Sequence, residues 1–246
     1  MSYDVFARYY DALTQNVNYE EMADYLCALL DKEGHKAGLT LDLACGTGSL
    51  TLALARRGLD IYGVDASMEM LSAAQEKAAE EELSILFLCQ KMQTLVLYGT
   101  VNTVFCTLDS LNHLTGEEDV RKTFSRVALF LERDGYFIFG MNTLYKHQYI
   151  LANQAYLYDT EDVFCAWQNH FEQKTGRVSI TLDFFEKRGK LYERSSESFF
   201  ERAYPLETIL KWLEEAGMEP RLVLESGTFE APSETTERVT IAARRI

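Results

Sequence analysis

Two short apolar runs flank a turn of small residues, and this arrangement limits the possible folds more than any other part of the chain. Leu39 to Leu43 has the length of a buried strand, and Ala44 to Gly48 supplies small residues where the backbone must turn sharply. A helix is predicted to follow and to end at Gly58, before a second buried strand from Leu59 to Val64. The segment therefore predicts one βαβ unit of an open, mostly parallel α/β sheet.

A βαβ unit places a ligand site beyond the carboxyl end of its first strand. There the glycine turn and the helix N-terminus expose backbone N–H groups that have no partner in the helix. Asp65 directly follows the second strand, where a carboxylate can accept hydrogen bonds from both hydroxyl groups of a ribose. We therefore expect a ligand of the adenosine type.

The turn itself favours one adenosine ligand over another. The dinucleotide motif G-x-G-x-x-G needs a third glycine, but here Gly46 and Gly48 are followed by Thr51. Asp42 lies on the first strand beside the turn, where its charge would repel a diphosphate and attract an ammonium group. S-adenosylmethionine carries a sulfonium and an α-ammonium group, so the residues favour this ligand.

The stretches LDLACGTG and GVDAS closely resemble the first two motifs of the class I S-adenosylmethionine-dependent methyltransferases. This resemblance implies an α/β, Rossmann-like fold with a mostly parallel seven-stranded sheet and a C-terminal antiparallel hairpin. It also implies methyl transfer from S-adenosylmethionine. The residues that we expect around this cofactor are Tyr10, Asp42, Ala44, Cys45, Gly46, Gly48, Asp65, Ala66, Met70, Lys91, Met92 and Leu108.

Two of these positions rest on segments that match the family less closely. The stretch FARYYDAL is similar to an N-terminal Tyr-Asp segment of bacterial methyltransferases in which a tyrosine closes over the methionine part, and this implies that role for Tyr10. Gln90-Lys91-Met92 stands where the family usually has Gln-Asp-Met, whose aspartate accepts a hydrogen bond from the adenine amino group. Lysine cannot accept a hydrogen bond, so we expect either the backbone or Gln90 to recognise adenine, or a weakened affinity.

The acceptor side is marked by the loop after the fourth predicted strand. This loop, LDSLNHL, resembles the family's D-S-L-N-Y-L segment and opens beside the glycine turn. Asp109 and His113 are therefore the candidates for catalysis and for acceptor binding, although an aspartate that caps a short helix and a histidine that packs would look the same. We also expect Tyr9 and Trp167 to contact the acceptor.

The remaining elements follow the expected order of helices and strands. Further strands are predicted at Ser84 to Cys89, Val101 to Thr107 and Tyr136 to Met141, and a terminal pair at Leu222 to Glu225 and Val239 to Ala243. Helices are predicted over residues 19 to 33, from Ser67, from a capping box at Thr115 to Glu118 up to Gly135, and from Pro205 to Gly217.

Residues 157 to 204 break this rhythm and alternate as antiparallel strands do, with turns at Thr175-Gly176 and Arg188-Gly189. We expect an antiparallel β lid over residues 146 to 204, inserted into a Rossmann-like domain formed by residues 1 to 145 and 205 to 246. The aromatic lid holds none of the cofactor motifs. Cofactor binding and acceptor choice are therefore expected to be separable.

The composition of the chain limits the kinds of substrate, metal and membrane partner that we expect it to bind. The chain of 246 residues carries a formal net charge of −14, which disfavours a nucleic-acid substrate and leaves a small-molecule methyl acceptor. The five cysteines have no C-x-x-C spacing, so neither a metal site nor a disulfide framework is expected. No membrane span and no secretory signal is recognised, which predicts a cytoplasmic protein, acting as a monomer or homodimer.

Two other functions remain open from the sequence. One is a module that binds S-adenosylmethionine without turnover, because Lys91 and His113 depart from the family pattern. The other is an NAD-dependent oxidoreductase, which the missing third glycine and Asp42 disfavour.

Overall fold

The computed structural model describes residues 4–246 and contains two separate sheets. The larger sheet has seven strands in the order β10-β11-β5-β4-β1-β2-β3. Its strands are β1 (Leu39–Leu43), β2 (Asp60–Asp65), β3 (Phe87–Cys89), β4 (Val101–Cys106), β5 (Leu131–Asn142), β10 (Met218–Glu225) and β11 (Arg238–Arg245). Strands β1 to β5 pair in parallel, whereas β11 is antiparallel to both β5 and β10. The predicted parallel sheet with a C-terminal antiparallel hairpin is thus confirmed.

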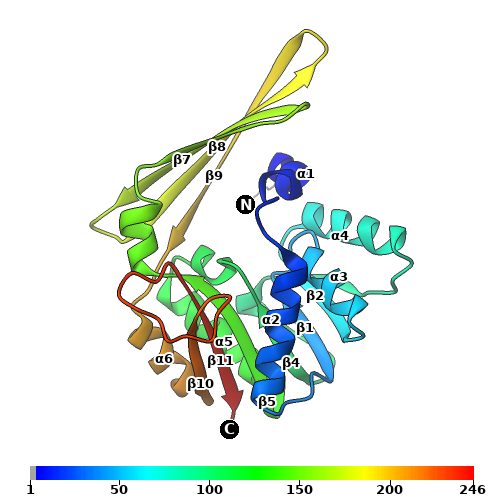
Figure 1. Cartoon of the computed structure of the whole chain (residues 1–246), viewed down its shortest axis with the longest axis vertical. Coiled ribbons are helices and arrows are strands. Elements are labelled where there is room, and N and C mark those ends of the chain that lie inside the picture. The colour runs from blue at the N-terminus through cyan, green and yellow to red at the C-terminus, as the bar shows by residue number, and fades with distance from the viewer. Residues whose placement is uncertain (1–3) are drawn as a thin grey trace.

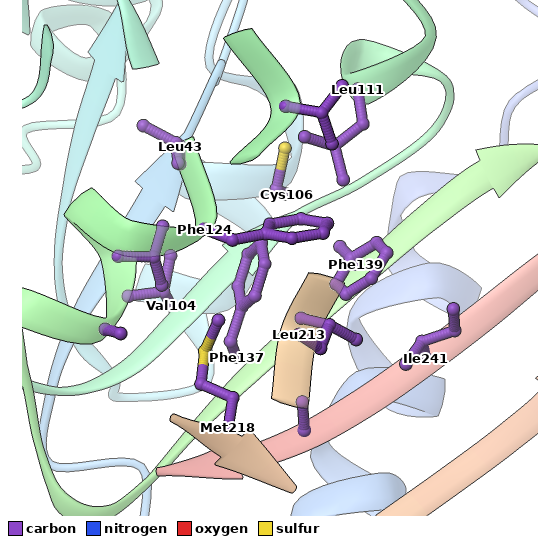
Figure 2. Close-up of a cluster of buried hydrophobic side chains, with 14 of the residues drawn as sticks. Leu43, Val104, Cys106, Leu111, Phe124, Phe137, Phe139, Leu213, Met218 and Ile241 are labelled. Carbon is purple, nitrogen blue, oxygen red and sulfur yellow. The ribbon is translucent and has the colours of Figure 1, made fainter. Parts of the chain in front are cut away.

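Helices cover both faces of this sheet (Figure 1). Helix α2 (Tyr19–Lys32) and helix α3 (Ser49–Arg56) share one buried cluster with β5 residues Tyr136 and Ile138. Helix α5 (Glu117–Phe130) and helix α6 (Leu206–Glu215) share the other cluster with Phe137 and Phe139. Successive side chains of β5 point to opposite faces of the sheet, so this strand contributes to both buried clusters. Figure 2 shows Phe124 of α5 packed against Phe137 and Phe139 in the second of these.

The predicted βαβ unit forms as β1, α3 and β2, and its glycines have distinct roles. Gly48 precedes α3 with a φ of +75°, and a Cβ atom there would lie only 2.8 Å from the Cβ of Ala74 in α4 (Met68–Glu80). The absence of a side chain therefore permits the close packing of α3 against α4. Gly58 has a φ of +85° just beyond the end of α3, as the sequence predicts.

The smaller sheet is antiparallel, in the order β6-β7-β8-β9, and lies between η3 (Lys146–Ile150) and α6 in the chain. Its strands are β6 (Ala155–Asp159), β7 (Val163–Glu172), β8 (Arg177–Arg188) and β9 (Leu191–Arg202). The sheet stands away from the helical layers, with helix α1 (Asp4–Leu13) beside it (Figure 1). We call this sheet the lid, as the sequence predicts one here.

Helix α1 belongs to the core of the lid. Phe6 and Leu13 of α1 are buried in one cluster with Cys165, Ile180 and Phe184 of the lid strands. A carboxylate of the lid also holds the start of the helix, because Glu197 Oε1 accepts the backbone N–H groups of Val5 and Phe6 at 2.8 and 3.2 Å. Two of the unpaired N–H groups at the helix N-terminus are satisfied in this way.

Several predicted boundaries are wrong, and Gly135 explains the largest error. Helix α5 ends at Phe130, and Leu131 already pairs with Val101 of β4 before the chain bulges at Asp134, whose φ is +61°. A Cβ atom on Gly135 would lie 2.7 Å from the backbone oxygen of Asn102. Gly135 therefore permits a close approach of two strands, and it does not end a helix.

Smaller corrections concern the ends of other elements. Gly116 is the N-cap of α5 and no side chain caps the helix there, so the predicted capping box does not form. Pro205 is the N-cap of α6 and lies outside the first turn. Strand β3 is shorter than predicted, whereas β10 and β11 extend further because they pair with each other over almost their full length.

Candidate active site

A cavity opens at the carboxyl ends of β1, β2 and β4, where a parallel sheet is expected to bind its ligand. Ten of the twelve predicted cofactor residues line it: Tyr10, Asp42, Ala44, Cys45, Gly46, Asp65, Ala66, Met70, Met92 and Leu108. The other two do not. Gly48 supports the packing of α3 against α4, and the side chain of Lys91 is exposed to solvent outside the cavity. We call this space the cofactor cavity.

Asp65 has the geometry that a ribose requires. Its Oδ2 accepts the backbone N–H of Gly46 and its Oδ1 that of Ser67, both at 2.9 Å. These bonds fix the carboxylate and use one acceptor position on each oxygen, so each retains capacity for a ribose hydroxyl. Burial raises the pKa of Asp65 above its ordinary value.

Gly46 leaves room where the ligand must come close. Its φ is +54°, and a Cβ atom on it would meet no heavy atom within 4 Å. Because Gly46 lines the cofactor cavity, a side chain at this position would project into otherwise unoccupied space. The turn thus combines a left-handed backbone with an open approach to its N–H groups, which fits an adenosine-type ligand.

Asp42 is held by the residue that replaces the third glycine of the dinucleotide motif. Thr51 donates its hydroxyl to Asp42 Oδ2 at 2.6 Å, and the Asp42 side chain is fully enclosed at the end of β1. Burial raises the pKa of Asp42 to about 7, and the nearby charge of Asp65 acts in the same direction. A sulfonium or ammonium group beside Asp42 would favour its ionised form.

This raised pKa predicts a pH dependence of cofactor affinity. A cationic ligand must bind the ionised form of Asp42, so the affinity for S-adenosylmethionine should rise about fivefold from pH 6 to pH 7 and less than twofold from pH 7 to pH 8. Without ligand, the folded state binds the proton more tightly than the unfolded chain. Its free energy of unfolding should therefore fall as the pH rises from about 4 to about 7.

Calorimetric titrations and urea unfolding across this pH range measure the two effects. Asp42→Asn removes the titrating group while keeping an acceptor for Thr51. The variant should show a flat affinity over the same interval, and a slope equal to that of the parent would exclude Asp42 as its origin.

Helix α1 forms a wall of the cofactor cavity. Phe6 and Tyr10 line it, and burial, together with the neighbouring Tyr19, raises the pKa of Tyr10 well above its ordinary value. Asp11 fastens the helix to the glycine turn: its Oδ1 accepts the hydroxyl of Thr47 and its Oδ2 pairs with Lys77 of α4, both at 2.7 Å. No local signal in the sequence marks Asp11, because only the tertiary fold brings these residues together.

Gln90 precedes the position at which the family has its aspartate, and its amide is engaged in its own loop. Its Oε1 accepts the N–H of Val96 at 2.9 Å, and its Nε2 donates to the Val96 oxygen at 3.0 Å. Each of these atoms retains a second hydrogen-bonding position, so recognition of adenine by Gln90 or by the backbone, or a weakened affinity, each stays a prediction. Met92 and Gln90 both still line the cavity.

A second cavity adjoins the first beneath the lid. The two share the lining residues Phe6, Tyr10, Leu108, Asp109 and His113, so the two spaces adjoin at these side chains. The lid contributes the remaining large walls, Tyr156, Tyr158, Trp167, Ile180 and Phe199. We call this space the acceptor cavity.

Three of the four residues predicted to contact the acceptor line the acceptor cavity, and the fourth does not. Asp109 and His113 lie at the boundary of the two cavities, and Trp167 lines the acceptor cavity while donating its Nε1–H to Asn169 at 2.7 Å. Tyr9 lines neither cavity. Its hydroxyl donates to Glu186 of the lid at 2.9 Å, and its ring stacks on Phe184.

Asp109 is tied into a polar network. Asn142 donates to its Oδ2 at 3.0 Å, and Arg238 approaches the same oxygen at 3.9 Å. Burial alone would raise the pKa of Asp109, but the charges of Arg238, His113 and Lys146 hold it below its ordinary value. Asp109 is therefore ionised at neutral pH and already has partners.

Among residues 4–246, no group of three or more potential ligands could hold a metal ion. Within the same part of the chain, no helix is long and apolar enough to cross a membrane.

Known proteins resemble the chain over its whole length. The model of a methyltransferase-domain family matches residues 40–135. A methyltransferase of Geobacillus sp. (strain WCH70) is 35% identical over the full length of both proteins. A crystal structure of an S-adenosylmethionine-dependent methyltransferase from Clostridium acetobutylicum is 33% identical, covers 99% of this chain and 98% of its own, and superposes with a TM-score of 0.89. An amino pentose methyltransferase with bound S-adenosylmethionine, from Micromonospora echinaspora, shares the fold at 17% identity, 96% coverage of both chains and a TM-score of 0.77.

The fold and the cofactor cavity define a Rossmann-like enzyme that binds an adenosine ligand at a glycine turn. The chain belongs to the class I S-adenosylmethionine-dependent methyltransferases. S-adenosylmethionine is its cofactor, and the protein is a transferase, neither an NAD-dependent oxidoreductase nor a module without turnover. When bound, the sulfonium supplies an activated methyl group, and the protein has to orient the acceptor and exclude water.

Proposed function

We propose that the enzyme methylates a nitrogen or oxygen atom of a small molecule that binds in the acceptor cavity. The observation that carries this proposal is the shared boundary of the two cavities, formed by Tyr10, Asp109 and His113 among others. A methyl donor in one cavity and a nucleophile in the other would meet where the two cavities adjoin, beside these side chains. In-line transfer requires such an arrangement of nucleophile, methyl carbon and sulfur.

The same arrangement of the two cavities suggests that different parts of the chain bind the cofactor and select the acceptor. We propose that residues 1–145 and 205–246 bind the cofactor and that residues 146–204 select the acceptor. The enclosing aromatic walls suit a small, partly apolar molecule, and the net charge of −14 opposes a nucleic-acid substrate. A monomeric or homodimeric, cytoplasmic enzyme remains our expectation.

A screen of acceptors with a matched pair of lid variants tests the proposal. Methyl transfer from labelled S-adenosylmethionine is measured for small amines, phenols, alcohols and carboxylic acids. Trp167→Ala removes a wall of the acceptor cavity and should lower kcat/KM at least about tenfold, because the acceptor loses apolar contact and orientation. The affinity for S-adenosylhomocysteine should stay unchanged.

Tyr192→Ala is the control, because Tyr192 is an exposed aromatic residue of the same sheet and lines neither cavity. Its kcat/KM should equal that of the parent. Equal activity of parent and Trp167→Ala toward the best acceptor would show that the acceptor binds elsewhere.

A further inference from the structure

A buried carboxylate in the acceptor cavity lacks the partners that such a group normally has. Glu201 lies near the end of β9, is 3% exposed and lines the acceptor cavity. Its Oε1 is 3.9 Å from Nε2 of His113, at the boundary with the cofactor cavity, and its Oε2 is 3.3 Å from Nε2 of His147. The closer approach has no hydrogen-bond geometry: neither Glu201 Oε2 nor either ring nitrogen of His147 has a hydrogen-bond partner among residues 4–246.

The burial of the Glu201 carboxylate without hydrogen-bond donors is energetically unfavourable unless a ligand supplies a donor. A carboxylate withdrawn from water costs free energy when donors do not replace the lost water molecules. Most buried side-chain polar atoms have such partners, so an exception inside a cavity indicates a group reserved for a ligand. A ligand with an N–H group would supply the missing donor.

The other charged groups around this cavity are arranged differently. Arg238 faces Asp109, which also accepts a hydrogen bond from Asn142, so these charges compensate one another. Lys146 also lines the cavity, and burial together with the charge of Arg238 lowers the pKa of its ammonium group. The charges of Asp109 and Glu201 both act to raise the pKa of Lys146, so this cation lies near both carboxylates. Among residues 4–246, no lysine or arginine forms an ion pair with Glu201 as Arg238 does with Asp109, and the close basic neighbours of Glu201 are His113 and His147.

We propose that Glu201 binds the amino group of the methyl acceptor, which makes the acceptor a small primary or secondary amine with an apolar body. This inference rests on the proposed function. The aromatic walls of the cavity suit the same ligand, since aromatic faces attract ammonium groups and pack against apolar ones. His113 places Glu201 next to the boundary across which the methyl group must pass.

The carboxylate of Glu201 can also accept the proton that the acceptor amine must lose before methyl transfer. As the bond between nitrogen and the methyl carbon forms, the carbon–sulfur bond breaks and its electron pair stays on the thioether sulfur. An ammonium group has no free electron pair, so before this step the acceptor transfers one proton to Glu201 and attacks as the neutral amine. The product nitrogen then carries the positive charge that the sulfonium loses, and Glu201 holds the transferred proton.

Binding of three probes that share a phenylethyl body and differ in their terminal polar group tests this assignment without knowledge of the natural acceptor. The protein saturated with S-adenosylhomocysteine is titrated calorimetrically with 2-phenylethylamine, 2-phenylethanol and 3-phenylpropionate. The parent protein should bind the amine at least about tenfold more tightly than the alcohol, the advantage expected for a hydrogen-bonded charge in a cavity. Glu201→Gln should lose this preference while its affinity for the alcohol stays the same.

The comparison between ligands separates recognition from folding, because a misfolded cavity would weaken amine and alcohol alike. Glu193→Gln is the matched control: Glu193 lies on the same strand but its side chain is 64% exposed and pairs with Arg188. This variant should keep the preference of the parent. A preference for the amine that persists in Glu201→Gln, tighter binding of 3-phenylpropionate, or no binding of the amine to the parent would each overturn the assignment.

Two further results would distinguish a failure of the amine assignment from a failure of the proposed function. A hydroxyl or carboxyl acceptor whose methylation depends on Trp167 but not on Glu201 would retain the acceptor cavity and refute the amine. A methylated acceptor that is indifferent to Trp167 would refute the acceptor cavity itself.

Discussion

Asp65→Ala should lower the affinity for S-adenosylhomocysteine by more than tenfold while the protein remains folded. The two oxygens of Asp65 are oriented by the N–H groups of Gly46 and Ser67 and face the cofactor cavity. Loss of hydrogen bonds to a charged group costs roughly 1.5–3 kcal/mol, and the ribose would lose such bonds. Isothermal titration calorimetry measures the change directly.

Asp60→Ala serves as the control, because Asp60 begins the same strand at its exposed, opposite end. Its affinity should match that of the parent. Asp65→Asn should fall between the two, since an amide retains one acceptor oxygen but no charge. If Asp65→Ala bound the ligand as tightly as Asp60→Ala, ribose recognition would have to lie elsewhere.

Removal of the lid should have the largest effect of all, because it opens the acceptor cavity to water. Replacing residues 153–201 by a short Gly/Ser linker should reduce methyl transfer below detection, since orientation of the reactants alone accounts for roughly 7–11 kcal/mol of the barrier. The linker itself is tolerable, because the entropy of loop closure rises slowly with length. Circular dichroism and size-exclusion chromatography establish that the truncated protein is a folded monomer before activity is measured.

The structure changes one part of the expectation from the sequence. Cofactor binding and acceptor choice were expected to be separable, but α1 packs in the lid core and also lines the cofactor cavity. The truncated protein should therefore also bind S-adenosylhomocysteine more weakly. Replacing only residues 187–192 by Asn-Gly closes the hairpin between Glu186 and Glu193 and should leave both properties intact. Full activity of the larger deletion would contradict the role of the lid.

Local rules account for what the sequence predicted correctly. Gly34, Gly58 and Gly217 all adopt positive φ values just beyond α2, α3 and α6, because a left-handed residue is the common way to end a helix. The turn between β1 and α3 follows from the residues within it, and so does the position of Asp65. The alternation over residues 157 to 204 predicted the lid because the period of two belongs to each strand separately.

Contacts between distant segments account for what the sequence could not predict. In the sequence, Thr51 is notable only because it stands where the dinucleotide motif has its third glycine. Its hydrogen bond to Asp42 depends on how α3 lies against β1. Glu201 lies in an ordinary strand pattern, and nothing nearby in the chain indicates that two histidines from other elements surround it. Gly135 was misinterpreted because close backbone approach and a helix end both favour glycine.

The position of α1 also bears on the kinetics of turnover. Glu197 joins the start of this helix to the lid, and Asp11 near its end joins it to Thr47 and Lys77 beside the glycine turn. The same helix is packed into the lid core. A movement of α1 would therefore disturb both cavities at once, and we expect exchange of the cofactor to be coupled to opening of the acceptor cavity.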